Sequence, residues 1–142
     1  MSLNVLYKVA LMMPLLIACS GEKEESLEGC NPEGDKIGRS VELESSGEHF
    51  APTGTVVIAE DCSIALTNFN WDATGDETYV WAGFYDDLAN GFPISEPINR
   101  EEAYEDTELV YQLPADRSLD DLDCIAIYET AVNEAFSWAL FQ

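Results

Sequence analysis

The stretch TVVIAEDCSIALTNF, residues 55–69, decides the fold class. A β-branched run covers Thr55–Ala59, the turn-forming pair Glu60-Asp61 follows, and apolar residues alternate with polar ones from Ser63 to Phe69. Side chains of this kind favour strands, and two such runs joined by a short polar turn indicate a β-hairpin. We therefore expect this stretch to form two antiparallel strands.

Further strand-like segments follow the hairpin. They cover Thr78–Tyr85, Leu109–Leu113, Ile125–Tyr128 and Phe136–Phe141. Short strands separated by turn residues are typical of an all-β sandwich or barrel.

Helical structure is expected only as single turns. One candidate is Asn99–Asp106, and the other is Ser118–Leu122, where Ser118 is suited to cap the turn. Neither segment is long enough for an independent helix. No internal repeat or second domain is visible, so we expect a single all-β domain.

The first residues read as a lipoprotein signal peptide. Lys8 gives a weakly positive start, an apolar run covers Val9–Ala18, and a strongly polar sequence follows Cys19. The run is too short to cross a bilayer core of ~30 Å as a helix. The segment Leu16-Ile17-Ala18-Cys19 resembles the bacterial lipobox, so we expect removal of residues 1–18 and lipidation of Cys19.

Residues 19–46 are rich in Gly, Ser and Glu, and we expect them to form a flexible tether. Ser20 follows the lipidated position where an Asp would retain many lipoproteins in the inner membrane, so the outer membrane is favoured. Lys23-Glu24-Glu25 also resembles an acidic signal for export to the cell surface. The expected location is therefore the bacterial envelope, lipid-anchored at the outer membrane and exposed at the surface.

The chain is strongly acidic, with 28 Asp and Glu against 6 Lys and Arg and a formal net charge of −22. Such a surface repels phosphate backbones, so a nucleic-acid partner is not expected. Charge does not favour anionic lipid either, so membrane attachment would depend on the acyl chains.

From Gly47 to Phe141 the chain resembles the DM13 domain family. The resemblance rests on ordered landmarks: Gly47 and Phe50, Gly54-Thr55-Val56, Leu66-Thr67-Asn68-Phe69, Gly75–Gly83, Tyr111-Gln112-Leu113-Pro114 and Ile125-Ala126-Ile127-Tyr128 with Phe136. It implies an antiparallel β-sandwich domain over residues 47–142, of a kind found in bacterial lipoproteins and animal matrix proteins.

The resemblance also implies a function. DM13 domains often accompany electron-transfer modules, and their proposed redox role depends on a cysteine within a Trp-Cys pair in the penultimate strand. In this chain the pair falls on Tyr128-Glu129, so the redox cysteine is replaced by a carboxylate. A carboxylate cannot carry out thiol chemistry and is a poor haem ligand. We therefore expect a non-catalytic binding domain, with a redox module as the alternative.

Three cysteines remain after Cys19. The envelope is oxidising, so Cys30, Cys62 and Cys124 permit one disulfide and leave one thiol. We favour Cys62–Cys124 slightly, because both would lie at one end of a sandwich, while Cys30 could pair with either. A reactive Cys30 is disfavoured, since its acidic neighbours would raise the thiol pKa.

Polar residues after the hairpin suggest two kinds of site. Asn70, Asp72, Asp76 and Glu77 supply oxygen ligands that calcium prefers, but their spacing does not match the twelve-residue calcium loop. A calcium-stabilised binding domain is thus a further alternative.

Trp71 lies in this polar stretch, and we expect an indole exposed beside Asp72 and Asp76. It is a candidate contact point for an envelope or extracellular protein or a glycan. The sequence predicts no cofactor, with haem and calcium left open, and it contains no recognisable catalytic constellation.

Overall fold

The computed structural model of the chain describes residues 30–47 and 50–142. The predicted signal peptide, Cys19 and the tether up to residue 29 lie outside the described residues. Within them, no helix has the length and apolar character needed to span a bilayer.

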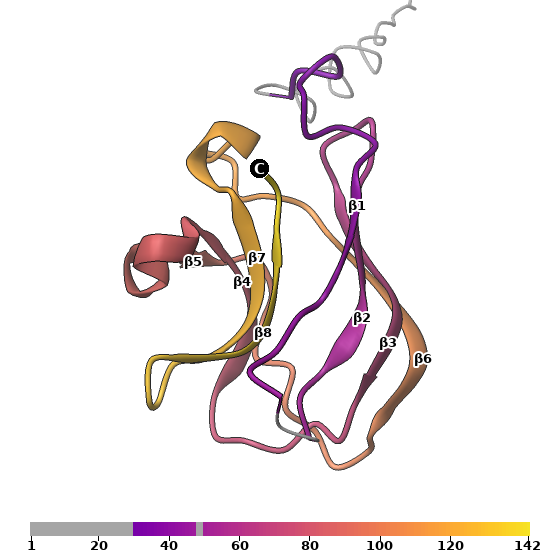
Figure 1. Cartoon of the computed structure of the whole chain (residues 1–142), viewed down its shortest axis with the longest axis vertical. Coiled ribbons are helices and arrows are strands. Elements are labelled where there is room, and N and C mark those ends of the chain that lie inside the picture. The colour runs from indigo at the N-terminus through magenta and orange to yellow at the C-terminus, as the bar shows by residue number, and fades with distance from the viewer. Residues whose placement is uncertain (1–29, 48–49) are drawn as a thin grey trace, which may run out of the picture.

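Eight strands form two four-stranded sheets (Figure 1). The first sheet has the order β1 (Ser40–Glu42), β2 (Thr53–Ile58), β3 (Ile64–Trp71) and β6 (Tyr104–Tyr111). The second has the order β5 (Phe92–Pro93), β4 (Thr78–Gly83), β7 (Cys124–Glu129) and β8 (Glu134–Leu140). Two short 3-10 helices, η2 (Tyr85–Asn90) and η3 (Leu119–Asp121), lie in the connections.

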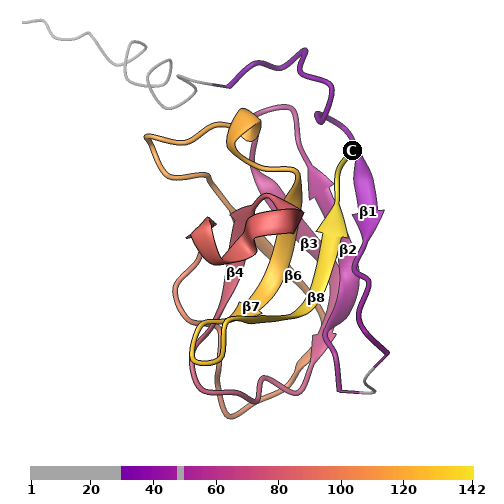
Figure 2. The ribbon, with the colours of Figure 1, turned by 60° about the vertical axis from the view of Figure 1, so that its left-hand side comes forward.

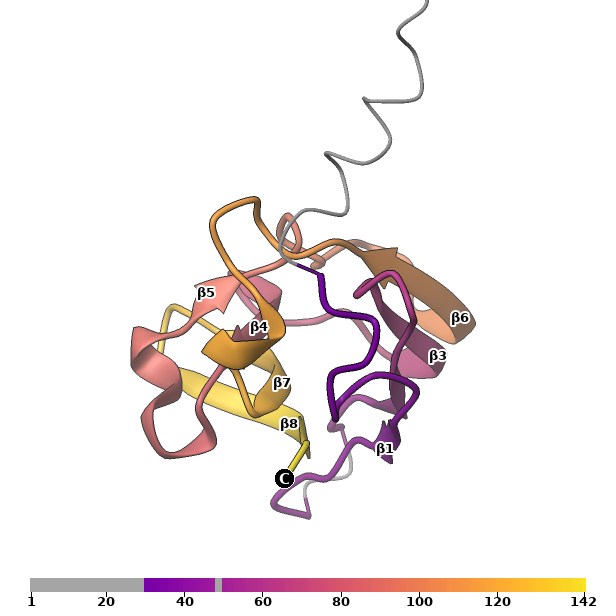
Figure 3. The same cartoon turned by 90° about the horizontal axis from the view of Figure 1, so that it is seen from above.

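All pairings between neighbouring strands are antiparallel. In the hairpin, Val56 pairs with Leu66 and Ile58 with Ile64. The two sheets lie face to face when the domain is seen from above (Figure 3). The predicted all-β antiparallel sandwich and its hairpin are therefore confirmed.

The core lies between the sheets and is built by alternation along the strands. Inward-facing side chains are fully buried, among them Val56, Ile58, Ile64, Leu66 and Phe69 from the first sheet and Val80, Ile125, Ile127 and Ala139 from the second. Burying an aliphatic or aromatic side chain of this size contributes ~1.5–3 kcal/mol. This burial holds the two layers together.

A second apolar cluster covers the outer face of the second sheet. It contains Trp81, Cys124, Ala126 and Tyr128. The η2 segment passes over this face (Figure 2), and the indole N–H of Trp81 donates to the carbonyl of Leu88 at 2.7 Å. The aromatic residues here are therefore largely covered.

The chain after β1 crosses from the first sheet to the edge of the second. Glu44 exchanges backbone hydrogen bonds of 2.7 and 2.8 Å with Trp138 of β8. Residues 40–44 are thus part of the folded domain. The predicted tether, which extended to residue 46, is wrong for this segment, because the residues pair with two different sheets despite their polar composition.

The predicted helical turns had different outcomes. Ser118 caps η3, accepting from the N–H of Asp120, while Asp121 accepts from the N–H of Ser118 at 2.9 Å, as a capping box requires. The turn predicted within Asn99–Asp106 is absent, because Tyr104 already pairs with Trp71 as the first residue of β6.

Candidate functional site

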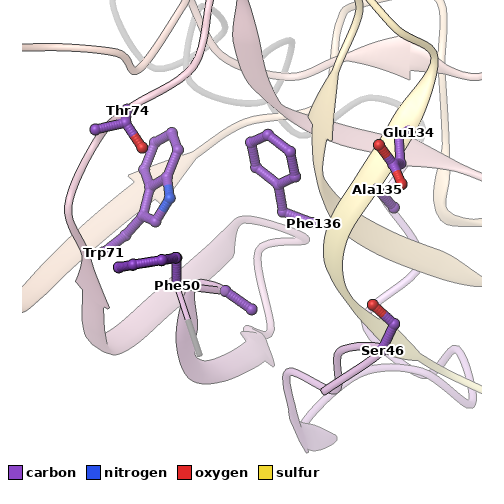
Figure 4. A pocket seen from close by; sticks show the side chains of 8 residues that line it. Ser46, Phe50, Trp71, Thr74, Glu134, Ala135 and Phe136 are labelled. Atoms are coloured by element: carbon purple, nitrogen blue, oxygen red, sulfur yellow. The ribbon is translucent and has the colours of Figure 1, made fainter. Parts of the chain in front are cut away.

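A pocket of about 210 Å³ opens at one end of the sandwich. It lies where the β1–β2 connection, the end of β3, the β3–β4 loop and the start of β8 meet. Its lining residues are Ser46, Phe50, Ala51, Trp71, Thr74, Glu134, Ala135 and Phe136. Figure 4 shows Trp71 and Phe50 on one side, with Phe136 and the Glu134 carboxylate on the other. The pocket is thus aromatic inside, with hydroxyl and carboxylate groups among its lining residues.

Trp71 forms the rigid wall of this pocket. The sequence suggested an indole exposed in a polar loop, but Trp71 ends β3 and is only 5 % exposed. Its ring stacks on Tyr104 with centroids 6.3 Å apart and 7° between planes, and it lies 6.1 Å from the ring of Phe136. The prediction of an exposed Trp71 is therefore wrong, because Trp71 continues the inward alternation of Phe69.

The other lining residues were not singled out from the sequence. Phe136 was expected within the last strand, and Phe50 was one of the landmarks of the family resemblance, but neither carried a local sign of a pocket. Glu134 begins β8 and is exposed. Only the packing of four distant segments brings these side chains together.

The β3–β4 loop, residues 72–77, contributes Thr74 to the lining of the pocket. Hydrogen bonds to the Glu129 side chain hold this loop against β7. One carboxylate oxygen of Glu129 accepts from the N–H of Asp76 and from the hydroxyl of Thr78, both at 2.9 Å. The other accepts from the N–H of Glu77 at 2.9 Å and from the N–H of Ala131 at 3.1 Å. Glu129 therefore holds the β3–β4 loop against the end of β7.

Gly75 makes the close approach of loop and carboxylate feasible. Its φ is +126°, and a Cβ at this position would lie 2.7 Å from Oε1 of Glu129 and 2.9 Å from Oγ1 of Thr78. A side chain here would be strained by the backbone conformation and would displace the carboxylate. The glycine is thus part of the Glu129 arrangement.

Glu129 stays ionised although it is only 3 % exposed. Burial by itself raises the pKa of this carboxyl group, but hydrogen bonds from the backbone of Asp76, Glu77 and Ala131, together with that from Thr78, outweigh burial and lower it. Four donors to a carboxylate favour the charged form.

This arrangement bears on the redox role implied by the family resemblance. The resemblance implies a redox cysteine at the position of Glu129, and in this chain both carboxylate oxygens of Glu129 accept hydrogen bonds within the domain. A carboxylate held in this way fits neither a thiol redox group nor an axial haem ligand. The hydrogen bonds of Glu129 instead hold the β3–β4 loop in place.

The residues predicted as calcium ligands do not converge. Asn70 accepts from the N–H of Asp106 at 2.9 Å, and Asp72 accepts from the hydroxyl of Thr74 at 2.8 Å. A carboxylate oxygen of Glu77 accepts from the hydroxyl of Tyr79 at 3.1 Å. In the part of the chain that the structure describes, no three His, Cys, Asp or Glu residues gather as a metal site would require.

Asp72 and Asp76, predicted with Trp71 as a contact surface, are exposed in the β3–β4 loop. Trp71 is buried and lines the pocket, so it does not share their exposed surface. The structure therefore places the aromatic and the acidic members of the predicted surface in different settings.

The disulfide joins Cys30 and Cys62, with an S–S distance of 2.01 Å and Cα atoms 5.8 Å apart. A disulfide was expected, but the favoured pairing of Cys62 with Cys124 is wrong. Cys62 lies in the β2–β3 turn of the first sheet, whereas Cys124 faces the outer cluster of the second. The free Cys124 is fully buried, and its burial, together with the charge of Asp123, raises the thiol pKa to about 12.

The disulfide and the pocket lie at opposite ends of the sandwich. Cys62 precedes β3 by two residues, and Trp71 ends this eight-residue strand. At ~3.4 Å per residue, the two ends of the strand are separated by roughly 25 Å. In Figure 1 the described N-terminal residues and the β2–β3 turn are at the top, and the connection between β1 and β2 is at the bottom.

Comparison with known proteins gives one match. A family model described as "Electron transfer DM13" matches residues 42–141, which is most of the described domain. No curated protein and no solved structure matches the chain. The matched range begins within β1, consistent with the folded character of that segment.

Proposed function

The chain belongs to the DM13 family, and from this premise we propose that it is a lipid-anchored bacterial envelope protein whose sandwich binds a partner through the pocket. The pocket is the observation that carries the proposal. Trp71 and Phe136 provide adjoining aromatic walls, and aromatic pockets with a few polar groups are typical of ligand sites. Glu129 holds the neighbouring loop in place.

The position of the disulfide supports this function. Lipidation at Cys19 would leave ten residues between the membrane anchor and Cys30. Such a segment reaches at most ~40 Å when extended. Because the disulfide joins Cys30 to Cys62 in the β2–β3 turn, the anchor would attach to the domain at the end opposite the pocket. Attachment at that end would leave the pocket open to partners outside the cell.

Site-specific photo-crosslinking tests the binding role. A photoreactive residue at Ser46, which is exposed beside the pocket, should give a discrete crosslinked product on intact cells. The same residue at Asp116, which is exposed in the loop preceding η3, is the matched control and should give none. Equal crosslinking at the two positions, or none at Ser46, would contradict a partner at the pocket.

The anchor is tested separately. Metabolic labelling with palmitate should label the wild-type protein, and Cys19→Ser should abolish the label and release the protein from membranes. Unchanged membrane association of the unlabelled variant would contradict the lipid anchor without bearing on the pocket.

Electron transfer is a second candidate, favoured by the description of the matching family model. The Cys30–Cys62 disulfide would then be its thiol couple, because Glu129 does not fit that role. The purified protein should show a haem Soret band or a disulfide that exchanges electrons reversibly with envelope oxidoreductases. A featureless visible spectrum and a disulfide inert to them would exclude this function.

A further inference from the structure

The chemistry of the pocket points to a particular class of ligand. From its rings and its charge we infer that it binds a quaternary or multiply methylated ammonium group, such as a choline-like headgroup or a methylated amine. The inference rests on the proposed binding function and names the chemical group that this site recognises.

The aromatic rings supply the first part of the argument. The planes of Trp71 and Phe136 meet at 51° with centroids 6.1 Å apart, so the two rings form adjoining walls rather than a closed stack. Phe50 lies near Trp71 and is 64 % exposed (Figure 4). Ring faces attract cations, and several rings around one small volume form the arrangement that selects quaternary ammonium ions.

The same aromatic stack already holds a cation at its other end. The guanidinium carbon of Arg100 lies 3.7 Å from the ring centroid of Tyr104, and Tyr104 stacks on Trp71. The guanidinium group of Arg100 also donates hydrogen bonds to the backbone carbonyls of Glu102 and Ala103. Trp71, which lines the pocket, therefore belongs to an aromatic stack that has a cation partner within the chain.

Charge supplies the second part. Among the described residues that line the pocket, Glu134 is the one charged side chain, and it is an acid. The formal net charge of the chain is −22. A cationic group is therefore attracted to this pocket, and an anionic one is repelled.

Hydrogen-bonding capacity distinguishes methylated from simple ammonium groups. An ammonium N–H needs an acceptor, and five of the eight lining side chains offer none: Phe50, Ala51, Trp71, Ala135 and Phe136. A lysine-type ammonium is strongly hydrated and would lose water contacts that this lining replaces only in part. A trimethylated nitrogen has no N–H groups to satisfy. The volume, about 210 Å³, is below the ~300 Å³ of ordinary small-molecule sites, which suits a compact headgroup.

Calorimetric titration of the full chain carrying Cys19→Ser tests the inference, with choline and tetramethylammonium as probes. The neutral isostere 3,3-dimethyl-1-butanol has the same shape as choline without its charge. Choline should bind at least tenfold more tightly than the alcohol. Glu134→Gln should weaken choline binding about threefold or more and leave the alcohol unaffected, whereas Glu108→Gln on exposed β6 should change neither.

A second variant tests the rings. Phe136→Leu keeps the apolar character but removes the ring face, so choline binding should fall fivefold or more while the alcohol changes little. A thermal melt of each variant establishes that it is folded, and Glu134 is exposed enough that its substitution should not disturb folding.

The outcomes separate this inference from the proposed function. Equal binding of choline and the alcohol, with crosslinking at Ser46 retained, would overturn the ammonium preference and leave a binding pocket. Choline binding that neither variant weakens would also overturn it. Loss of crosslinking at Ser46 together with tight choline binding would overturn the macromolecular partner and leave the ammonium site.

Discussion

The carboxylate of Glu129 accepts a hydrogen bond of 2.9 Å from the backbone N–H of Asp76, fifty-three positions earlier in the chain. This contact joins the end of β7 to the loop that supplies Thr74 to the pocket. At a position where the family resemblance implies a redox cysteine, the chain uses a carboxylate to shape a loop. The Glu129 carboxylate thus has a structural role next to the pocket.

Glu129→Gln should destabilise the domain. The amide NH₂ can only donate, so it would oppose backbone N–H groups or the Thr78 hydroxyl that now donate to the carboxylate. Leaving buried donors unsatisfied costs about 1–3 kcal/mol. For a domain of this size, the melting temperature should fall by roughly 5–10 °C. Glu108→Gln on exposed β6 is the control and should melt like the wild type; equal melting temperatures for the two variants would contradict the role of Glu129.

The stabilising effect of Glu129 should depend on pH. Its pKa in the folded protein is lowered from the ordinary value of 4.5, so its contribution is fully present above about pH 5. As the pH falls below 4.5, the unfolded chain takes up a proton before the folded one does, and the contribution is lost as the pH passes through the folded pKa. The difference in unfolding free energy between wild type and Glu129→Gln, from urea denaturation, should therefore shrink from pH 7 to pH 3. A difference that is constant or grows in acid would contradict this assignment.

Local sequence patterns predicted the fold well. The hairpin of residues 55–69 was predictable because both strands and their turn lie within fifteen residues, and alternation alone sets which side chains face the core. The cap of η3 was likewise predictable, since Ser118 and Asp121 are three residues apart.

The site was less predictable, because its parts come from distant segments. Polar neighbours on both sides of Trp71 concealed its inward position, which depends on pairing with Tyr104 of β6. The role of Glu129 was equally hard to predict from the sequence, because two of its hydrogen-bond donors lie in a loop more than fifty positions away. The β1 segment looked like a tether because three residues give no clear alternation.

Removing the disulfide should destabilise the domain. The Cys30–Cys62 bond closes a loop with a sequence separation of 32. A loop of this length corresponds to about 3–4 kcal/mol in the chain-entropy model. The double variant Cys30→Ser/Cys62→Ser should therefore lose about this much unfolding free energy in urea denaturation. Wild type under mild reduction should match the variant, and an unchanged stability in both would contradict a stabilising disulfide.

A thiol count distinguishes the two pairings that the sequence left open. In the chain carrying Cys19→Ser, the Cys30–Cys62 bond leaves Cys124 as the remaining thiol, fully buried and with its pKa raised to about 12. Thiolate is the reactive form, so Ellman's reagent at pH 8 should find no reactive thiol in the native protein and one after unfolding without reductant. The additional variant Cys124→Ser should then show none in either state. A pairing of Cys62 with Cys124 would instead leave Cys30, which is partly exposed, to react in the native protein, and it would contradict the arrangement described above.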